Sequence, residues 1–275
     1  MMTTSLLTMG VIGFFFAIVL SLATKTLAVE SDPKVDAIEE VLPGANCGAC
    51  GYAGCRAFAE AVASGQAPID GCPVGGQAVA RAVAEIMGVA APEGITRKIA
   101  QLLCNGGCTE ATNRSEYYGA QDCRAALLAG GGSKGCTYGC LGLGTCEVHC
   151  PFDAITMNDN NLPVVDEELC TGCGKCVEAC PRDLFQLVEE PQGVHIRCRS
   201  FAKGKDVRQV CTVGCIGCRR CVKECPYDAI HMEGMLAVID YDKCTNCGQC
   251  VEVCPTNTIH KQPNKEFIEK AVAVS

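Results

Sequence analysis

Four cysteine-rich blocks decide the fold of this chain: CTYGCLGLGTCEVHCPFDAI (residues 136–155), CTGCGKCVEACP (170–181), CTVGCIGCRRCVKECPYDAI (211–230) and CTNCGQCVEVCP (244–255). The last three each contain an uninterrupted C-x2-C-x2-C-x3-C-P run. Three thiolates on one tight loop can bind three corners of a [4Fe–4S] cubane, while the fourth ligand comes from elsewhere in the chain. The proline after the fourth cysteine keeps the loop from continuing as a helix. The spacing therefore predicts iron–sulfur clusters.

The blocks also form an internal repeat, which indicates a duplicated unit. Residues 136–155 align with residues 211–230 without a gap, and both copies end in C-P-[FY]-D-A-I. Leu143 stands where the second copy has Cys218, so the first copy has lost one ligand of its run. Cys136, which precedes the run, is the expected replacement.

The C-x2-C-x2-C-x3-C-P run is that of bacterial ferredoxins, in which the fourth cysteine ligates the neighbouring cluster. This crossed pattern predicts four ligand sets: Cys136, Cys140, Cys146 and Cys180; Cys150, Cys170, Cys173 and Cys176; Cys215, Cys218, Cys221 and Cys254; and Cys225, Cys244, Cys247 and Cys250. The alternative is structural zinc or disulfides. Zinc prefers isolated sets of four ligands, so fused runs followed by proline argue against it.

The composition fits small cluster-binding domains in a reducing compartment. The 275 residues include 25 Cys and no Trp, and the formal net charge is −8. A chain of this length has room for a few small domains, and metal-type cysteine runs favour reduced thiolates over disulfides. The negative charge argues against nucleic acid as a partner. No G-x-G-x-x-G motif follows a predicted strand and no catalytic triad stands out, so we expect neither a nucleotide site nor bond-making chemistry.

An uncharged apolar segment lies near the N-terminus. Ser5–Thr24 contains no charged residue and is long enough to cross a bilayer as a helix. The rival interpretation is a cleaved signal peptide, but no Lys or Arg precedes the apolar run. We therefore expect a single-pass anchor in the cytoplasmic membrane. Lys25 and the need of the thiols for a reducing compartment favour the cytoplasmic side for the bulk of the chain.

A second type of cysteine pattern follows the apolar segment. Cys47, Cys50, Cys55 and Cys72 have the spacing C-x2-C-x4-C-x16-C. Glycines between them let the backbone approach an inorganic core closely. The spacing resembles that of a small iron–sulfur domain of corrinoid-pathway proteins and electron-transfer subunits, with a zinc knuckle as the alternative. We predict a fifth [4Fe–4S] cluster at these ligands.

Five cysteines remain after five sets of four: Cys104, Cys108, Cys123, Cys198 and Cys211. We predict a sixth cluster ligated by Cys104, Cys108 and Cys123 with either Cys198 or Cys211. The alternative is that these thiols pack as small apolar residues. Iron content distinguishes the two, at roughly 24 irons per chain for six clusters and roughly 20 for five.

A basic stretch lies inside this acidic chain. Its Lys and Arg residues are Arg197, Arg199, Lys203, Lys205, Arg208, Arg219, Arg220 and Lys223. Positive charge beside clusters can steer an acidic protein partner toward them, and we predict this role for Arg219, Arg220 and Lys223. The alternative is an ordinary solvated loop.

Several motifs together resemble the B subunit of the Rnf complex family. They are GANCGACGYAGC (44–55), CPVGG (72–76), DCRAALLAGG (122–131), CTYGCLGLGTC (136–146) and VGCIGC (213–218), and an apolar segment precedes them. The resemblance covers nearly the whole chain and implies an iron–sulfur subunit of an ion-transporting translocase. Such a subunit accepts electrons from reduced soluble ferredoxin and relays them toward flavin-bearing and membrane subunits. In that family, electron transfer between ferredoxin and NAD is coupled to movement of Na⁺ or H⁺, so NAD, flavin and ion sites would belong to partners.

We therefore expect an α+β chain in seven segments. They are a transmembrane anchor (1–27), a connector (28–42), an N-terminal [4Fe–4S] domain (43–90), a cysteine-containing intermediate region (91–134), two tandem ferredoxin-like units with two clusters each (135–190 and 191–260) and a tail (261–275). Helices are expected at 56–64 and 77–88, and short strands within 161–170 and 235–244, each leading into a cluster loop.

Two other functions fit parts of the pattern. The first is a polyferredoxin-type relay of a membrane hydrogenase or dehydrogenase without ion pumping, against which the apolar anchor and the Cys47–Cys72 domain argue. The second is an iron–sulfur redox sensor. A sensor would need an exposed labile cluster and a regulatory output domain, and the sequence shows neither.

Overall fold

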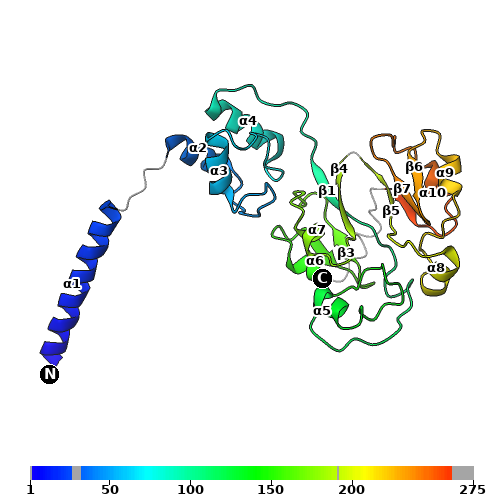
Figure 1. Ribbon diagram of the computed structural model, residues 1–275, viewed down its shortest axis with the longest axis horizontal. Helices are drawn as coiled ribbons and strands as arrows, with labels where there is room; N and C mark the ends of the chain where they lie inside the picture. Colours follow the sequence, from blue (N-terminus) through cyan, green and yellow to red (C-terminus); the bar gives the residue numbers. More distant parts are fainter. Residues whose placement is uncertain (1, 27–31, 191, 262–275) are drawn as a thin grey trace.

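The computed structural model describes residues 2–26, 32–190 and 192–261 (Figure 1). Along the chain it contains one long helix set apart from the rest, a small helical domain, and two α+β units that share one plan. The predicted tail lies outside the described residues except for its first residue.

Helix α1 (Met2–Thr26) covers the predicted apolar segment. Large apolar side chains on it, among them Leu7, Phe14 and Phe15, are more than half exposed. Among the residues that the structure describes, no helix reaches the combination of length and hydropathy expected of a membrane span.

Three helices form the N-terminal domain: α2 (Pro33–Val41), α3 (Cys55–Ala63) and α4 (Gly76–Met87). The Asp32 carboxylate caps α2 by accepting a hydrogen bond from the Lys34 N–H at 2.9 Å. Ile38 of α2 is buried in one apolar core with Phe58 and Val83. The segment predicted as a connector therefore contributes a helix to this domain, and α3 and α4 confirm the two predicted helices.

The first α+β unit consists of two two-stranded antiparallel sheets and three short helices. Strand β1 (Lys98–Leu102) pairs with β4 (Phe185–Glu189), and β2 (Ile155–Met157) pairs with β3 (Pro163–Val165). The helices are α5 (Cys123–Leu128), α6 (Thr145–Val148) and α7 (Lys175–Ala179). Because β1 pairs with β4 along its whole length, the unit starts at Lys98, inside the region predicted to be separate.

The second unit repeats this plan. Strand β5 (Val194–Ile196) pairs with β8 (Ile259–Lys261), and β6 (Ile230–Glu233) pairs with β7 (Leu236–Ile239). Its helices are α8 (Gly204–Val210), α9 (Arg220–Glu224) and α10 (Gln249–Glu252). Strands β3 and β7 confirm the strands predicted before the cluster loops.

The core of each unit is small and includes cysteine side chains. In the first unit Cys140 and Cys176 are buried with Leu184 and Phe185. In the second, Cys221 and Cys250 are buried with aliphatic strand residues. The candidate sites therefore occupy the centre of each unit.

An extended segment of the first unit connects it to the second. Ala111 forms a bridge with Cys211, and Asn113 forms one with Lys134. The Thr112 N–H donates to the Val210 carbonyl at 2.9 Å. The two units are thus joined by backbone hydrogen bonds beside cysteines of both.

Candidate iron–sulfur centres

Site 1 is the N-terminal set of Cys47, Cys50, Cys55 and Cys72. Three of these thiols pack against the apolar core of the helical domain. Burial, together with the charges of Cys50 and Cys47, raises the pKa of Cys72. Asn46 Oδ1 accepts a hydrogen bond from the Cys55 N–H at 2.8 Å, and a Cβ on Gly54 would lie 2.8 Å from that oxygen. A glycine is required there for the loop to close around the thiols.

Site 3 is the predicted set of Cys150, Cys170, Cys173 and Cys176, which the first unit brings together. Burial, and then the charges of Cys170 and Cys173, raise the pKa of Cys176 to about 12. The Ala100 N–H of β1 donates a hydrogen bond to Cys170 Sγ at 3.4 Å. A strand from the predicted intermediate region therefore supports this site.

Sites 4 and 5 lie in the second unit, and the structure brings both predicted sets together. Cys215, Cys218, Cys221 and Cys254 line a hollow of about 360 Å³ (site 4), and Cys225, Cys244, Cys247 and Cys250 line one of about 330 Å³ (site 5). Although burial opposes it, N–H donors of Thr256, Thr258 and Ile259 lower the pKa of Cys254. The Ala229 N–H donates to Cys225 Sγ at 3.4 Å. Such N–H···S bonds are typical of cluster ligands.

Site 2 differs from the predicted set in one ligand. The hollow of about 380 Å³ in the first unit is lined by Cys123, Cys140, Cys146 and Cys180, and Cys136 does not line it. Burial, and then the charges of Cys123 and Cys180, raise the pKa of Cys146 to about 12. Cys123 is thus the fourth thiol of site 2, where the cysteine run has Leu143 instead of a cysteine.

Hydrogen bonds between the starts of α5 and α6 place Cys123 beside Cys146. The Cys123 N–H donates to Thr145 Oγ1 at 2.7 Å, and the Thr145 hydroxyl donates to the Asp122 carboxylate at 3.2 Å. Asp122 also caps α5 by accepting from the Ala125 N–H at 2.8 Å. Thr145 is 3% exposed, so its hydroxyl is buried, whereas Asp122 and Cys123 are half-buried.

Cys136 lies in another hollow, of about 380 Å³, together with Cys104, Cys198 and Cys211. We call these four cysteines site 6. The predicted sixth set therefore keeps Cys104 and includes both Cys198 and Cys211, but it loses Cys108 and Cys123. Cys108 is exposed, and its thiol lies 3.3 Å from Asn160 Oδ1.

Sets of four cysteine thiolates are the usual ligands of [4Fe–4S] clusters. Among the described residues, no three His, Cys, Asp or Glu side chains approach closely enough to hold one metal ion. A cubane binds its thiolates to separate iron atoms, which holds them farther apart than one tetrahedral zinc ion does. Arg182 lines site 2, and within the described chain its buried Nε has no hydrogen-bond partner, so it can donate to a cluster sulfur.

The predicted docking residues lie at the surface of the second unit. Arg219, Arg220 and Lys223 are exposed at α9. Arg219 also lines the hollow of site 4, beside the exposed Cys218. Three of the basic residues predicted with them, Lys203, Lys205 and Arg208, are exposed at α8.

Families of iron–sulfur domains match three parts of the chain. A family described as "Putative Fe-S cluster" matches residues 42–74, which contain site 1. Families described as "4Fe-4S dicluster domain" match residues 137–187 and 214–258, which contain the cysteine runs of the two units.

Relatives match over most of the chain. The B subunit of an Na(+)-translocating ferredoxin:NAD(+) oxidoreductase complex of Acetobacterium woodii is 55% identical over 236 residues, covering 86% of this chain and 71% of the relative. The B subunit of an ion-translocating oxidoreductase complex of Methanosarcina acetivorans is 44% identical, covering 85% and 88%. The B subunit of a proton-translocating ferredoxin:NAD(+) oxidoreductase complex of Clostridium ljungdahlii is 46% identical, covering 87% and 84%.

Proposed function

The chain belongs to the family of B subunits of ion-translocating oxidoreductase (Rnf) complexes, and we propose that it relays electrons from reduced ferredoxin toward flavin and NAD subunits of such a complex. When bound, the clusters would accept and release single electrons. The complex couples this transfer to translocation of Na⁺ or H⁺. The observation that carries the proposal is a series of cysteine sites that begins in the N-terminal helical domain and continues through both α+β units.

Electrostatic interactions between thiols of neighbouring sites support the series. Burial, and then charges that include Cys47 of site 1, raise the pKa of Cys173 of site 3. The charge of Cys146 of site 2 likewise acts on Cys176 of site 3. In the second unit, α9 carries Cys221 of site 4, and Cys225 of site 5 follows directly after it. Short spacing between sites is what a relay of single electrons requires.

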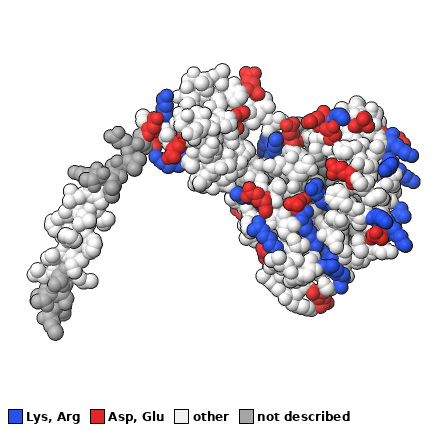
Figure 2. Space-filling view, in the orientation of Figure 1, with Lys and Arg blue, Asp and Glu red and all other residues white. Residues whose placement is uncertain are grey.

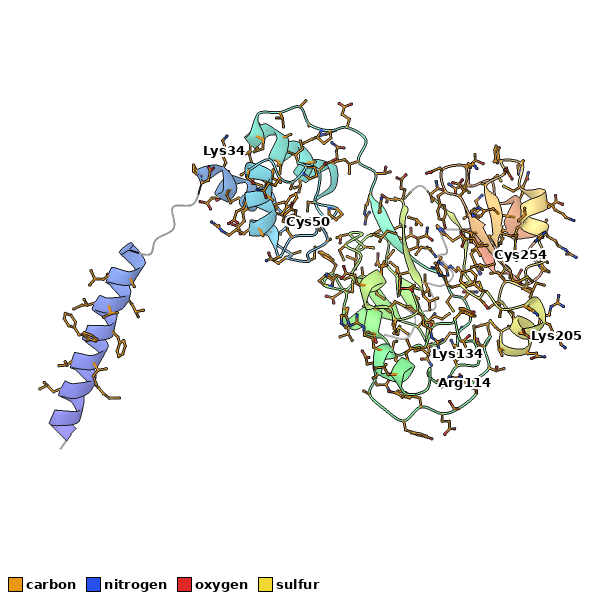
Figure 3. The ribbon with its side chains drawn as sticks, in the orientation of Figure 1. Lys34, Cys50, Arg114, Lys134, Lys205 and Cys254 are labelled. Carbon is orange, nitrogen blue, oxygen red and sulfur yellow. The ribbon has the colours of Figure 1, made fainter. Side chains whose placement is uncertain are left out.

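A basic face marks the end of the series where an acidic ferredoxin would dock. Figure 2 shows Lys and Arg side chains gathered at the edge of the second unit over α8 and α9, and Lys205 lies at this outer edge (Figure 3). We call Lys203, Lys205, Arg208, Arg219, Arg220 and Lys223 the basic face. Since the chain as a whole is acidic, this local positive charge favours an acidic partner here.

The backbone at Arg219 supports a role for its charge. Arg219 precedes α9 with φ 61°, whereas glycines 144, 174 and 248 hold the corresponding places before α6, α7 and α10. A side chain in this left-handed conformation costs about 1–2 kcal/mol. Because glycine adopts this backbone conformation with less strain, an arginine at this position indicates a role for its guanidinium at site 4.

The opposite end of the protein would face the membrane part of the complex. Helix α1 lies far from the basic face in Figure 1, and site 1 is the cysteine set nearest to it in sequence. We propose that the uncharged segment of α1 attaches the chain to the membrane, with the remaining residues on the cytoplasmic side. Deletion of residues 2–26 should then release the chain from washed membranes, and unchanged membrane association would contradict this attachment.

Purification of the assembled complex tests the function. The C-terminally tagged chain is isolated anaerobically from gently solubilised membranes, and the proteins that accompany it are identified. We expect multi-span and flavin-bearing subunits, and ferredoxin-dependent reduction of NAD⁺ by the preparation. A hydrogenase or dehydrogenase core in their place would overturn the proposal and favour a relay without ion pumping.

A further inference from the structure

We propose that site 6, formed by Cys104, Cys136, Cys198 and Cys211, binds a [4Fe–4S] cluster that bridges the two ferredoxin-like units. None of these four cysteines lies within residues 42–74, 137–187 or 214–258, the parts that match iron–sulfur families. The site itself is inferred from geometry, and only its use in electron transfer rests on the proposed function.

The four thiols come in equivalent pairs from the two repeated units. Cys104 follows the end of β1 by two residues, as Cys198 follows the end of β5. Cys136 and Cys211 hold the same place in the repeat, ahead of the cysteine run of each unit. Each unit therefore contributes two ligands, and the hollow lies where the units meet.

The hydrogen bonds that Cys104 and Cys198 accept are also equivalent in the two units. The Cys140 N–H donates to Cys104 Sγ at 3.4 Å, and in the second unit the Cys215 N–H donates to Cys198 Sγ at 3.3 Å. Cys140 belongs to site 2 and Cys215 to site 4. A cluster at site 6 would therefore be joined to the ligands of both neighbouring sites by one hydrogen bond on each side.

Backbone contacts hold the other two ligands in place. The Gly135 N–H, just before Cys136, donates to the Thr112 carbonyl at 2.7 Å. On the other side of the same segment, the Thr212 N–H, just after Cys211, donates to the Glu110 carbonyl at 2.9 Å. One extended segment thus fixes Cys136 and Cys211 relative to each other through backbone hydrogen bonds.

Small residues leave room beside the thiols. A Cβ on Gly106 would lie 2.9 Å from Cys211 Sγ. A Cβ on Gly139 would lie 3.5 Å from Cys136 Sγ, and one on the equivalent Gly214 would lie 3.7 Å from Cys211 Sγ. The hollow of about 380 Å³ matches those of sites 2, 4 and 5, which measure 330–380 Å³. Site 6 therefore offers the same space as sites built from ferredoxin runs.

One buried and one half-buried cation offset the negative charge that four thiolates would bring. Lys134 lines the hollow, is 5% exposed, and donates to the Gly106 carbonyl at 2.5 Å; Figure 3 labels its place in the first unit. Arg182 donates to the Cys136 carbonyl at 3.0 Å. A buried ammonium without a nearby anion would be costly, so Lys134 indicates an anionic group at site 6.

Iron analysis of the full chain tests the site. The wild-type chain, purified anaerobically and fully loaded with iron and sulfide, should contain roughly 24 irons, from six clusters of four. Cys198→Ala and Cys136→Ala should each lower this to roughly 20, and the double variant should also contain roughly 20, because both residues bind one cluster. Cys108→Ala is the matched control and should keep the wild-type content.

A second double variant tests which cysteines belong to site 6. Cys123→Ala combined with Cys198→Ala should lose roughly eight irons, since these residues belong to different sites. A wild-type content near 20, an additive loss in the Cys136/Cys198 pair, or iron loss in Cys108→Ala would overturn the proposal. Spin quantitation of the dithionite-reduced chains by EPR gives an independent count of the same clusters. Neither measurement uses ferredoxin, so failure of the proposed function would leave these results unchanged.

Discussion

The hydroxyl of Thr145 connects two cluster ligands that are distant in sequence. It accepts from the Cys123 N–H and donates to Asp122, while its own backbone begins the helix that carries Cys146. Thr145→Val would leave the half-buried Cys123 N–H without a partner, and an unsatisfied group of this kind costs about 1 kcal/mol. We expect a lower urea midpoint of the holo-protein, followed anaerobically by visible absorbance. Thr145→Ser keeps the hydroxyl and should stay close to wild type; equal losses in both variants would contradict the role of the bond.

Arg219 combines a strained backbone with a charge at site 4. Arg219→Gly should relieve the left-handed strain and raise stability by about 1 kcal/mol, and the same change should slow electron uptake from ferredoxin. Stability and uptake are measured on the same preparation. A variant that is both more stable and equally fast would show that the guanidinium has no part in docking.

Single residues also explain which cysteine sites could be predicted from the sequence and which could not. The cysteine runs predict sites 1, 3, 4 and 5 because their ligands follow fixed local spacings. Cys123 was not predicted for site 2, since its position depends on the Asp122–Thr145 contact between two helices. The loss at Leu143 was visible, but sequence proximity favoured Cys136, which the fold directs to site 6.

At the scale of elements, β1 packs against the loop that carries site 3. Gly172 in that loop has φ +67°, and a Cβ there would collide with the Lys98 carbonyl of β1. Gly172→Ala should therefore destabilise the holo-protein more than the left-handed strain alone, which is about 1–2 kcal/mol. Gly234→Ala is the matched control, because Gly234 has φ +62° with nothing within 4 Å of the added Cβ. Equal shifts of the urea midpoint would show that the contact with β1 does not matter.

Strand β1 also explains why the first ferredoxin-like unit was predicted to begin at residue 135, whereas in the structure it begins at Lys98. Residues 91–134 lack a ferredoxin run, so the sequence indicated a separate region. Long-range pairing of β1 with β4 makes it part of the first unit, and pairing at that sequence separation has no local signal. The equivalence of Cys104 and Cys198 becomes visible only once β1 and β5 are recognised as equivalent strands.

At the scale of the whole molecule, the distribution of charge and the order of the sites indicate that electrons enter at the basic face and move toward the end that carries α1. The basic face lies at one end, and α1 lies at the other. Neutralising Arg219 and Arg220 to Gln should slow electron uptake from an acidic ferredoxin about tenfold at low salt and flatten its dependence on ionic strength. Arg81→Gln, at an exposed position on α4, is the control and should leave both unchanged. Equal effects from the two sets of changes would indicate a general charge effect.

Electron uptake by the protein is measured by anaerobic stopped-flow mixing of the oxidised full chain with reduced ferredoxin. Absorbance follows ferredoxin oxidation, and EPR of rapidly frozen samples counts the electrons that arrive on the chain. Each electron lost by ferredoxin should appear on the chain, at a rate that falls as salt is added. Ferredoxin that stays reduced in the presence of the fully loaded chain would contradict a role of this protein as the acceptor of ferredoxin electrons.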